Sequence, residues 1–138
     1  MDLIMKLTIA YLEAMKVKYK TEKDNIISLT ASGLQNKTSL EVLVTFDDDA
    51  NTLALKTKEY ASFGENQKTK IYEVCARANA LYRWAKFYPD EENNTVIIAA
   101  DAIVDFDSCG EELMQLVHNV GQAADEAFPE FMQVMWLE

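Results

Sequence analysis

The most reactive side chains in the sequence are one histidine, His118, and two cysteines, Cys75 and Cys109. A general base needs a nucleophile and an orienting acid close by, whereas His118 lies between Val117 and Val120 in a run with helical spacing. We therefore expect a structural or merely exposed histidine. The cysteines lie far apart and form no C-x-x-C pair, so we expect two buried, reduced thiols. Sequence spacing alone leaves a disulfide between them open, because it does not fix their separation.

Two acidic segments carry carboxylates at alternate positions, the arrangement that surrounds calcium in an EF-hand loop. The segment that begins at Asp47 lacks the glycine of the sixth position and has Lys58 where the bidentate glutamate belongs. The segment that begins at Asp105 has Cys109 in place of an oxygen ligand and Leu116 at the final position. We expect neither segment to bind a metal. The acids that follow position 105 fit a helix start, where negative charge complements the helix dipole.

Motifs for nucleotide binding and for hydrolysis are missing from the sequence. It contains no G-x-S-x-G, G-x-x-x-x-G-K-[ST] or G-x-G-x-x-G run, and its four glycines offer little material for a phosphate cradle. An enzyme of another type would need acids such as Asp101, Asp105 and Asp107 to cluster in a cleft. We rank that interpretation last and expect a protein without catalytic residues, cofactor or metal.

The charge of the chain is strongly acidic, because 23 Asp and Glu residues oppose 13 Lys and Arg residues and leave a formal net charge of −10. Such a chain repels phosphate backbones and anionic lipid surfaces, so we expect neither a nucleic-acid partner nor a membrane partner. The first six residues lack the basic start of a secretory signal, and no apolar run approaches the roughly 20 residues of a membrane span. We therefore expect a cytoplasmic protein.

One domain over residues 1–138 is expected from the length of the chain, and the 49% of hydrophobic residues predicts a packed core. Apolar residues recur every three or four positions in three segments and at alternate positions in five others. The predicted helices cover 2–16, 71–85 and a segment from 108 onward, and the predicted strands cover 25–31, 40–46, 53–58, 86–88 and 95–104. Short connections favour antiparallel neighbours. The expected fold is α+β with a five-stranded antiparallel sheet covered by helices, in the order α-β-β-β-α-β-β-α.

Three details of the predicted helices bear on their surroundings. The first helix has an unusually broad apolar stripe, which favours packing on a sheet on one side and on a second subunit on the other, although burial within its own domain fits equally well. Trp84 is expected on the polar side of the second helix. Ser108 and Glu111 match a capping box at the start of the third helix, and Pro129 is expected to kink or restart that helix.

Four stretches of the carboxyl-terminal half carry a family resemblance: N-A-L-Y-R-W-A-K-F-Y at 79–88, T-V-I-I-A-A-D-A at 95–102, C-G-E-E-L at 109–113 and D-E-A-F-P-E-F at 125–131. With them, the segment from Ile71 to Trp136 resembles the YbjN-like family of bacterial proteins. The resemblance implies a fold like that of type III secretion chaperones and a role as a sensory transduction regulator, and it implies no catalytic residues. Members often carry two asparagines three positions apart on the second helix; Asn79 matches the first, and Tyr82 stands at the second.

Large, adaptable apolar side chains are the remaining functional lead, since Met and aromatic residues often anchor protein contacts. The candidate partner-binding residues are Trp84, Phe131, Met132, Met135 and Trp136. Taken singly, residues of this kind more often belong to the core. The preferred interpretation is a non-enzymatic, homodimeric module that binds a protein partner or peptide segment, as a chaperone or regulatory adaptor. The alternative is a small-molecule sensor domain with a ligand pocket between helix and sheet.

Overall fold

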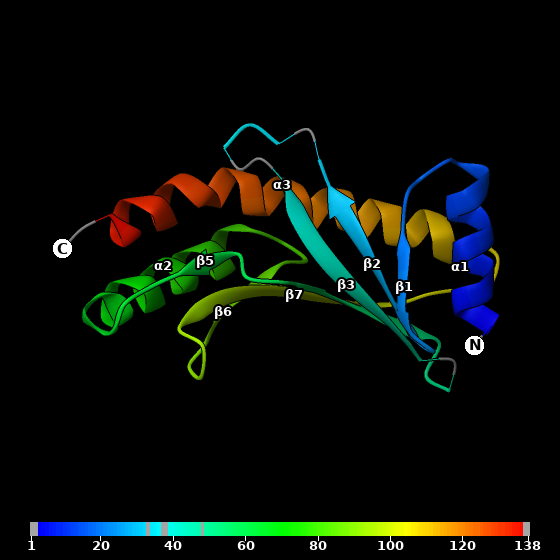
Figure 1. Cartoon of the computed structure of the whole chain (residues 1–138), viewed down its shortest axis with the longest axis horizontal. Coiled ribbons are helices and arrows are strands. Elements are labelled where there is room, and N and C mark those ends of the chain that lie inside the picture. Colours follow the sequence, from blue (N-terminus) through cyan, green and yellow to red (C-terminus); the bar gives the residue numbers. More distant parts are fainter. Residues whose placement is uncertain (1–2, 33, 37–38, 48, 137–138) are drawn as a thin grey trace.

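Alternating apolar residues build one antiparallel sheet in this computed structural model, which describes residues 3–32, 34–36, 39–47 and 49–136 (Figure 1). Within these residues the sheet has seven strands. They are β1 (Lys20–Lys23), β2 (Ile26–Ala31), β3 (Leu40–Asp47), β4 (Thr52–Thr57), β5 (Ala61–Ser62), β6 (Lys86–Asp90) and β7 (Thr95–Ile103). They lie in the order β1-β2-β3-β4-β7-β5, and β6 also pairs with β7.

The helices are α1 (Leu3–Ala14), α2 (Lys68–Leu81) and α3 (Cys109–Met135), and a short 3-10 turn, η1 (Glu65–Gln67), leads into α2. Helix α3 runs along the long axis of the molecule behind the sheet, while α1 stands at one end and α2 at the other (Figure 1). The buried side of α3 includes Leu113, Val120 and Phe131, spaced as one stripe of the helix. The fold is therefore the expected α+β arrangement, with helices packed on an antiparallel sheet.

The alternation of side chains along β3 decides which face of the sheet is buried. Leu40, Val42 and Val44 are buried, whereas Glu41 and Asp47 are exposed. Successive side chains of a strand point to opposite faces, so the helices cover the first set and the second set faces outward.

An aromatic cluster around Tyr60 joins the sheet to α3. The Tyr60 ring lies edge-on to the rings of Phe87, Phe128 and Phe131, with centroid separations of 5.9, 5.6 and 5.4 Å. Its hydroxyl donates a hydrogen bond to the carbonyl of Ala124 at 2.6 Å. Burial raises the pKa of Tyr60 far above its ordinary value, so the hydroxyl keeps the proton that it donates.

The number of strands differs from the prediction of five. The five expected strands are all present, and the expected hairpins 40–58 and 86–104 are antiparallel pairs. No sequence pattern predicts the two additional strands. All four residues of β1 are exposed, so β1 shows no alternation of apolar residues, and β5 has only two residues. The order of elements is therefore α-β-β-β-β-β-α-β-β-α.

The second helix ends at Leu81, before the predicted end at 85. Tyr82 already has an extended backbone, and the amide side chain of Asn79 binds the backbone of Phe87. This tertiary contact draws β6 back along α2, so the chain leaves the helix earlier than its apolar periodicity indicates. Trp84 consequently lies in the α2–β6 connection, and the expectation that it sits on the polar side of the helix is wrong.

The start of α3 lacks the expected capping box. Ser108 is the N-cap residue, but its side chain makes no capping hydrogen bond. Glu112, rather than Glu111, turns back to the preceding segment, where its carboxylate accepts a hydrogen bond from the backbone N–H of Asp105 at 3.3 Å. Both glutamates lie in the first turn of the helix, where negative charge complements the helix dipole, as the sequence predicts.

Pro129 lies inside α3, which continues to Met135 without restarting. A proline cannot donate the backbone hydrogen bond to the carbonyl four residues earlier, which is that of Asp125. Asn36 supplies a donor instead, because its Nδ2 lies 2.9 Å from that carbonyl oxygen. The backbone N–H groups of Gln35 and Asn36 also donate to the Asp125 carboxylate, at 3.0 and 2.7 Å. The connection after β2 thus replaces the bond that proline removes.

Candidate functional site

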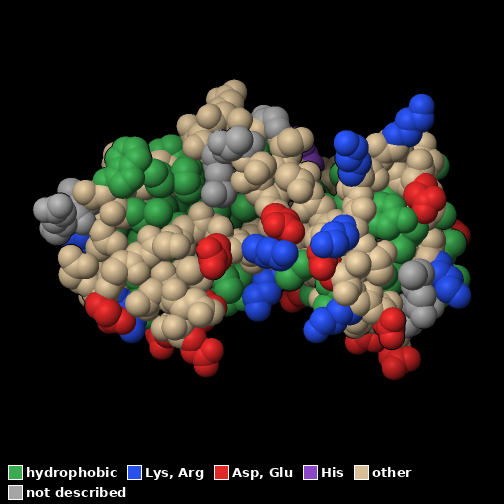
Figure 2. Space-filling model, viewed as in Figure 1, with side chains coloured by type: hydrophobic (Ala, Val, Ile, Leu, Met, Phe, Trp, Pro, Cys, Tyr) green, Lys and Arg blue, Asp and Glu red, His purple; other side chains and the backbone are tan. Residues whose placement is uncertain are grey.

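Large apolar side chains remain exposed at several places on the described part of the chain. They are Leu3, Leu7 and Met15 near the amino terminus, Leu81 at the end of α2, Trp84 after it, Ile103 at the end of β7, Phe106 before α3, and Trp136 at the end of α3. Figure 2 shows that apolar side chains also gather over the carboxyl-terminal half of α3. In that half Phe128, Met132 and Met135 are partly buried.

Trp84 is held in an unusual turn. Its φ is +70°, in the left-handed region, and the backbone N–H of Ala85 donates to the carbonyl of Arg83 at 2.7 Å. This is a three-residue γ-turn with Trp84 at its centre, a conformation that costs about 1–3 kcal/mol for a residue with a bulky side chain. Fully buried Ala85 fixes the end of the turn. Trp84 is nevertheless 58% exposed, so much of the indole lies outside the packed core.

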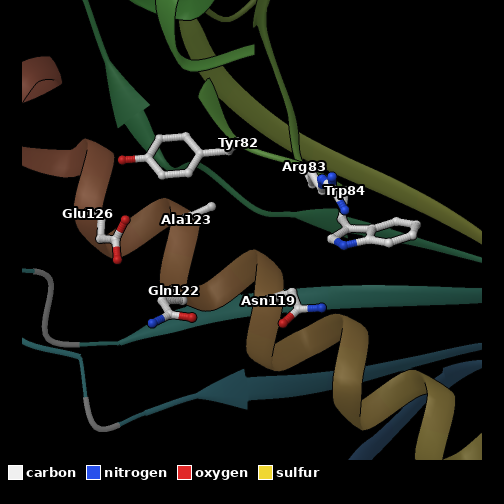
Figure 3. A pocket seen from close by; sticks show the side chains of 7 residues that line it. All are labelled: Tyr82, Arg83, Trp84, Asn119, Gln122, Ala123 and Glu126. Atoms are coloured by element: carbon white, nitrogen blue, oxygen red, sulfur yellow. The ribbon is translucent and has the colours of Figure 1, made fainter. Parts of the chain in front are cut away.

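A hollow of about 270 Å³ opens beside this turn (Figure 3). Tyr82, Arg83 and Trp84 line one side of it, and α3 lines the other. The residues from α3 are Asn119, Gln122, Ala123 and Glu126. Three of these four are polar and follow one another at positions i, i+3 and i+7, so they form one row along the helix. We call this hollow and its lining the Trp84 surface.

Tyr82 contributes an aromatic face and a hydroxyl that stays protonated. Partial burial and the neighbouring carboxylate of Glu126 raise the pKa of Tyr82. Aromatic rings, two amides and one carboxylate can stack on and hydrogen-bond to a bound molecule. The Trp84 surface is therefore a candidate binding site.

A second hollow, of about 580 Å³, adjoins the first, because Gln122 and Glu126 of α3 line both. Thr30, Ser32 and Leu34 from β2 and the connection after it line one wall, and Met114 and His118 from α3 line the other, with further residues on both sides. The pairing of β1 with β2 ends at Ser28, so the adjoining part of β2 has no β1 neighbour on that edge. This hollow lies between helix and sheet, where the sequence-based alternative expects a ligand pocket.

The residues considered for catalysis do not converge. His118 is exposed, and so are Asp101, Asp105 and Asp107. Cys75 and Cys109 are buried free thiols. Among the described residues, no group of three or more His, Cys, Asp or Glu side chains could hold a metal ion. Within the same residues, no helix has the length and apolar character to cross a bilayer.

The five candidate partner-binding residues separate in the structure. Trp84 and Trp136 are exposed, at 58% and 77%, but Trp136 lies roughly 25 Å further along α3 than the Asn119 that faces the Trp84 surface, at a rise of about 1.5 Å per residue. Met132 and Met135 are partly buried beside Trp136. Phe131 is fully buried in the aromatic cluster, so its assignment as a partner contact is wrong and it is a core residue.

Sequence reasoning did not identify the polar half of the Trp84 surface. Asn119, Gln122 and Glu126 carry a detectable signal, because they follow helical spacing on the polar side of α3. That signal alone describes any solvated helix face. Only the fold, which places the α2–β6 connection opposite this row, distinguishes it from the rest of the helix surface.

Comparisons with known proteins agree with the fold. The chain is similar to the crystal structure of YbjN from E. coli, with a TM-score of 0.64, 11% identity and 91% of both chains covered. A chain of the ExsC–ExsE complex gives a TM-score of 0.56 at 16% identity, with 91% of this chain and 93% of that chain covered. A chain of the heterodimeric ExoU–SpcU complex, from the type III secretion system of Pseudomonas aeruginosa, gives 0.52 at 13%, with 90% and 97% covered. No curated protein matches the sequence.

At these identities the structural similarities establish the fold, and they confirm that it resembles that of a chain from a type III secretion complex. The sequence itself matches the model of one family, YbjN, described as "Putative bacterial sensory transduction regulator", over residues 10–133. That match covers nearly the whole chain, including the Trp84 surface, and confirms the resemblance found in the sequence. The chain belongs to the YbjN family.

Proposed function

We propose that the protein is a non-enzymatic module that binds a protein partner through the Trp84 surface, as a chaperone or regulatory adaptor. The observation that carries this proposal is Trp84 itself, an indole that the backbone holds outward in a strained turn. Strained residues persist where the surrounding structure forces them, and they concentrate at functional sites. Tryptophan is also the residue type most enriched among the anchors of protein interfaces.

The neighbouring row on α3 suits a peptide partner. Amide side chains can donate to and accept from the backbone of an extended segment, as Asn79 does within this protein when it binds the backbone of Phe87. Asn119 and Gln122 present the same groups beside the indole. The partner would bury an apolar side chain against Trp84 and pair its backbone with this row.

The comparisons support a protein partner. Two structures with this fold are complexes between two different proteins, ExsC with ExsE and ExoU with SpcU. We further propose that the module acts in the cytoplasm as a homodimer, and that Met132, Met135 and Trp136 form a second contact for the same partner. These three residues lie together at the end of α3, where apolar side chains gather in Figure 2.

Capture experiments test this function. The full chain is used as bait in its native host, alongside Trp84→Ala and the matched control Ile103→Ala, which truncates an 84% exposed side chain outside the Trp84 surface. The proposal expects one protein to be retained by wild type and I103A and lost with W84A. Retention of the same proteins by all three baits would contradict it.

A second candidate function is a small-molecule sensor, because the 580 Å³ hollow between β2 and α3 falls within the usual range of about 300–1,000 Å³ for ligand pockets. Met114→Trp would place a larger side chain in this hollow and narrow it. If the protein is a sensor, a metabolite that raises the melting temperature of wild type and W84A will have no effect on M114W. A metabolite panel without any such compound removes the support for this candidate.

A further inference from the structure

The Trp84 surface carries opposite charges at its two ends (Figure 3). Glu126 lies beside Tyr82 at one end of the hollow. Arg83 lies beside Trp84 at the other end, on the side of Asn119. Glu126 follows Asn119 by seven residues, so at a rise of about 1.5 Å per residue the two ends are separated by roughly 10 Å along α3.

Neither of these two charges is neutralised by another charged side chain of the described residues. Arg83 and Glu126 are both exposed, and they form no ion pair with each other. The ion pairs within the described ranges involve Lys58 and Arg77 instead, and both leave Arg83 and Glu126 out. The positive and the negative end of the hollow are therefore available to a bound molecule.

The end at Glu126 suits a cationic group. The carboxylate of Glu126 and the ring of Tyr82 line the hollow side by side. A lysine or arginine side chain can lie against the aromatic ring while its charged head pairs with the carboxylate. Burial of this group is shallow, so the pairing contributes more to selectivity than to affinity.

The end at Arg83 suits an anionic group. The Oδ1 of Asn119 already accepts a hydrogen bond from the Nε2 of Gln115 at 3.3 Å, so Asn119 presents its Nδ2 donor to a bound molecule. A carboxylate can accept hydrogen bonds from this amide and from the Arg83 guanidinium. The indole of Trp84 lies at the same end, where it can contact an apolar side chain next to the carboxylate.

We propose that the Trp84 surface recognises an extended peptide segment that carries both charges, with a basic side chain at Glu126 and an acidic side chain at Arg83. The inference rests on the proposed function and adds which side chains the partner presents beside its apolar anchor. An extended chain advances about 3.3 Å per residue, so the two charged residues of the segment lie about two to four positions apart.

Other occupants fit these charges less well. A free amino acid holds its ammonium and carboxylate groups much closer together than the two ends of the hollow. A nucleic acid carries negative charge alone, which Glu126 and the net charge of −10 both repel. A purely basic segment would bring like charges together at Arg83, and a purely acidic one would do so at Glu126, which weakens binding.

Selection from a phage-displayed library of random dodecapeptides tests the charge pattern. Wild type is expected to enrich peptides with one acidic and one basic residue at the stated spacing, beside an apolar residue. Arg83→Glu should instead enrich peptides with two basic residues, and Glu126→Lys peptides with two acidic residues. These results are expected whichever direction the peptide takes along α3. The same pattern from all three proteins would overturn the proposal.

Matched variants separate the local contacts from the effect of net charge. Lys86→Glu and Glu73→Lys change the net charge by the same amounts as R83E and E126K, at exposed positions outside the Trp84 surface. Both should enrich the wild-type pattern. If K86E shifted the pattern as R83E does, overall charge would select the peptides and the proposal would fail. Near-ultraviolet circular dichroism checks that each variant is folded.

Fluorescence polarisation of a labelled peptide from the wild-type selection measures the contact at Arg83. This peptide is expected to bind R83E about threefold to tenfold more weakly than wild type. A second peptide, in which lysine replaces the acidic residue, should prefer R83E to wild type. If both peptides changed in parallel, Arg83 would not face the acidic residue and the assignment would be wrong.

Failure of this inference and failure of the proposed function give different results. Peptides that bind wild type but not W84A and show no shared charge pattern would reject only the charge pattern. If W84A enriched the same peptides as wild type, the extended segment would be rejected as the occupant. The capture experiment with W84A and I103A then decides separately whether a protein partner depends on Trp84.

Discussion

Asn79 binds both backbone groups of Phe87, as a neighbouring strand would. Its Oδ1 accepts a hydrogen bond from the Phe87 N–H at 2.6 Å, and its Nδ2 donates to the Phe87 carbonyl at 2.9 Å. Phe87 lies in β6, at an edge of the sheet, so these bonds close part of an exposed strand edge from the side of α2. The asparagine that matches the family pattern therefore has a structural role, and it positions the connection that carries Trp84.

Asn79→Asp keeps the acceptor for the Phe87 N–H but places a carboxylate oxygen against the Phe87 carbonyl. We expect it to lower the free energy of unfolding by about 2–4 kcal/mol, at least as much as Asn79→Ala, because a donor is replaced by a charged acceptor. Urea denaturation of the three proteins measures this. If N79D were as stable as wild type, the two hydrogen bonds would not hold β6 to α2.

Pro129 and Asn36 should be energetically coupled through the Asp125 carbonyl. Asn36→Ala is expected to cost about 1 kcal/mol in wild type, because it removes the donor that replaces the missing proline N–H. In a Pro129→Ala background the helix supplies its own donor, so the same N36A change should cost less. A double-mutant cycle measures the coupling, and strictly additive losses would show that the two residues do not share this acceptor.

Trp84→Gly should separate the stability of the turn from binding. Glycine adopts a φ of +70° without strain, so the substitution should relieve about 1–2 kcal/mol of backbone strain. This gain is expected to offset two losses, namely the indole contacts and the greater conformational entropy of the unfolded chain. We expect W84G to unfold within about 1 kcal/mol of wild type and to lose its partner in the capture experiment. A strong destabilisation of W84G would indicate that the indole supports the fold.

Cys75 should make the protein less stable in alkali. Burial raises the pKa of its thiol from 9.0 to about 11. The folded state therefore keeps a proton that the unfolded chain releases, and the free energy of unfolding falls as the pH rises from about 9 toward 11, by about 2–3 kcal/mol in total. Tyrosines with raised pKa values contribute in the upper part of this range, so the readout is the difference between wild type and Cys75→Ala. Parallel pH profiles for the two proteins would contradict the assignment.

Most of the framework could be predicted from the sequence because it depends on local patterns. One side of each of β3, α2 and α3 is buried, so their apolar residues recur at regular spacing in the sequence. This spacing is what predicts the three elements. β1 escaped prediction because an exposed edge strand has no buried side, and β5 because two residues cannot define a period.

The remaining differences depend on contacts between separate elements of the fold. The end of α2 is decided by Asn79 and Phe87, and the continuity of α3 through Pro129 by Asn36 from the other end of the chain. The sequence also could not predict which apolar side chains are exposed. Phe131 and Trp136 belong to the same apolar run, but Phe131 packs on Tyr60 and Phe87 in the core, whereas Trp136 is exposed.

The affinity of the captured partner for Trp84 variants tests the central claim most directly. Isothermal titration of the purified partner into wild type, W84A and I103A compares one exposed apolar truncation inside the Trp84 surface with one outside it. We expect W84A to bind at least about 30-fold more weakly, equivalent to about 2 kcal/mol, and I103A to bind like wild type. Equal affinities for wild type and W84A would contradict the claim that this protein binds its partner through Trp84.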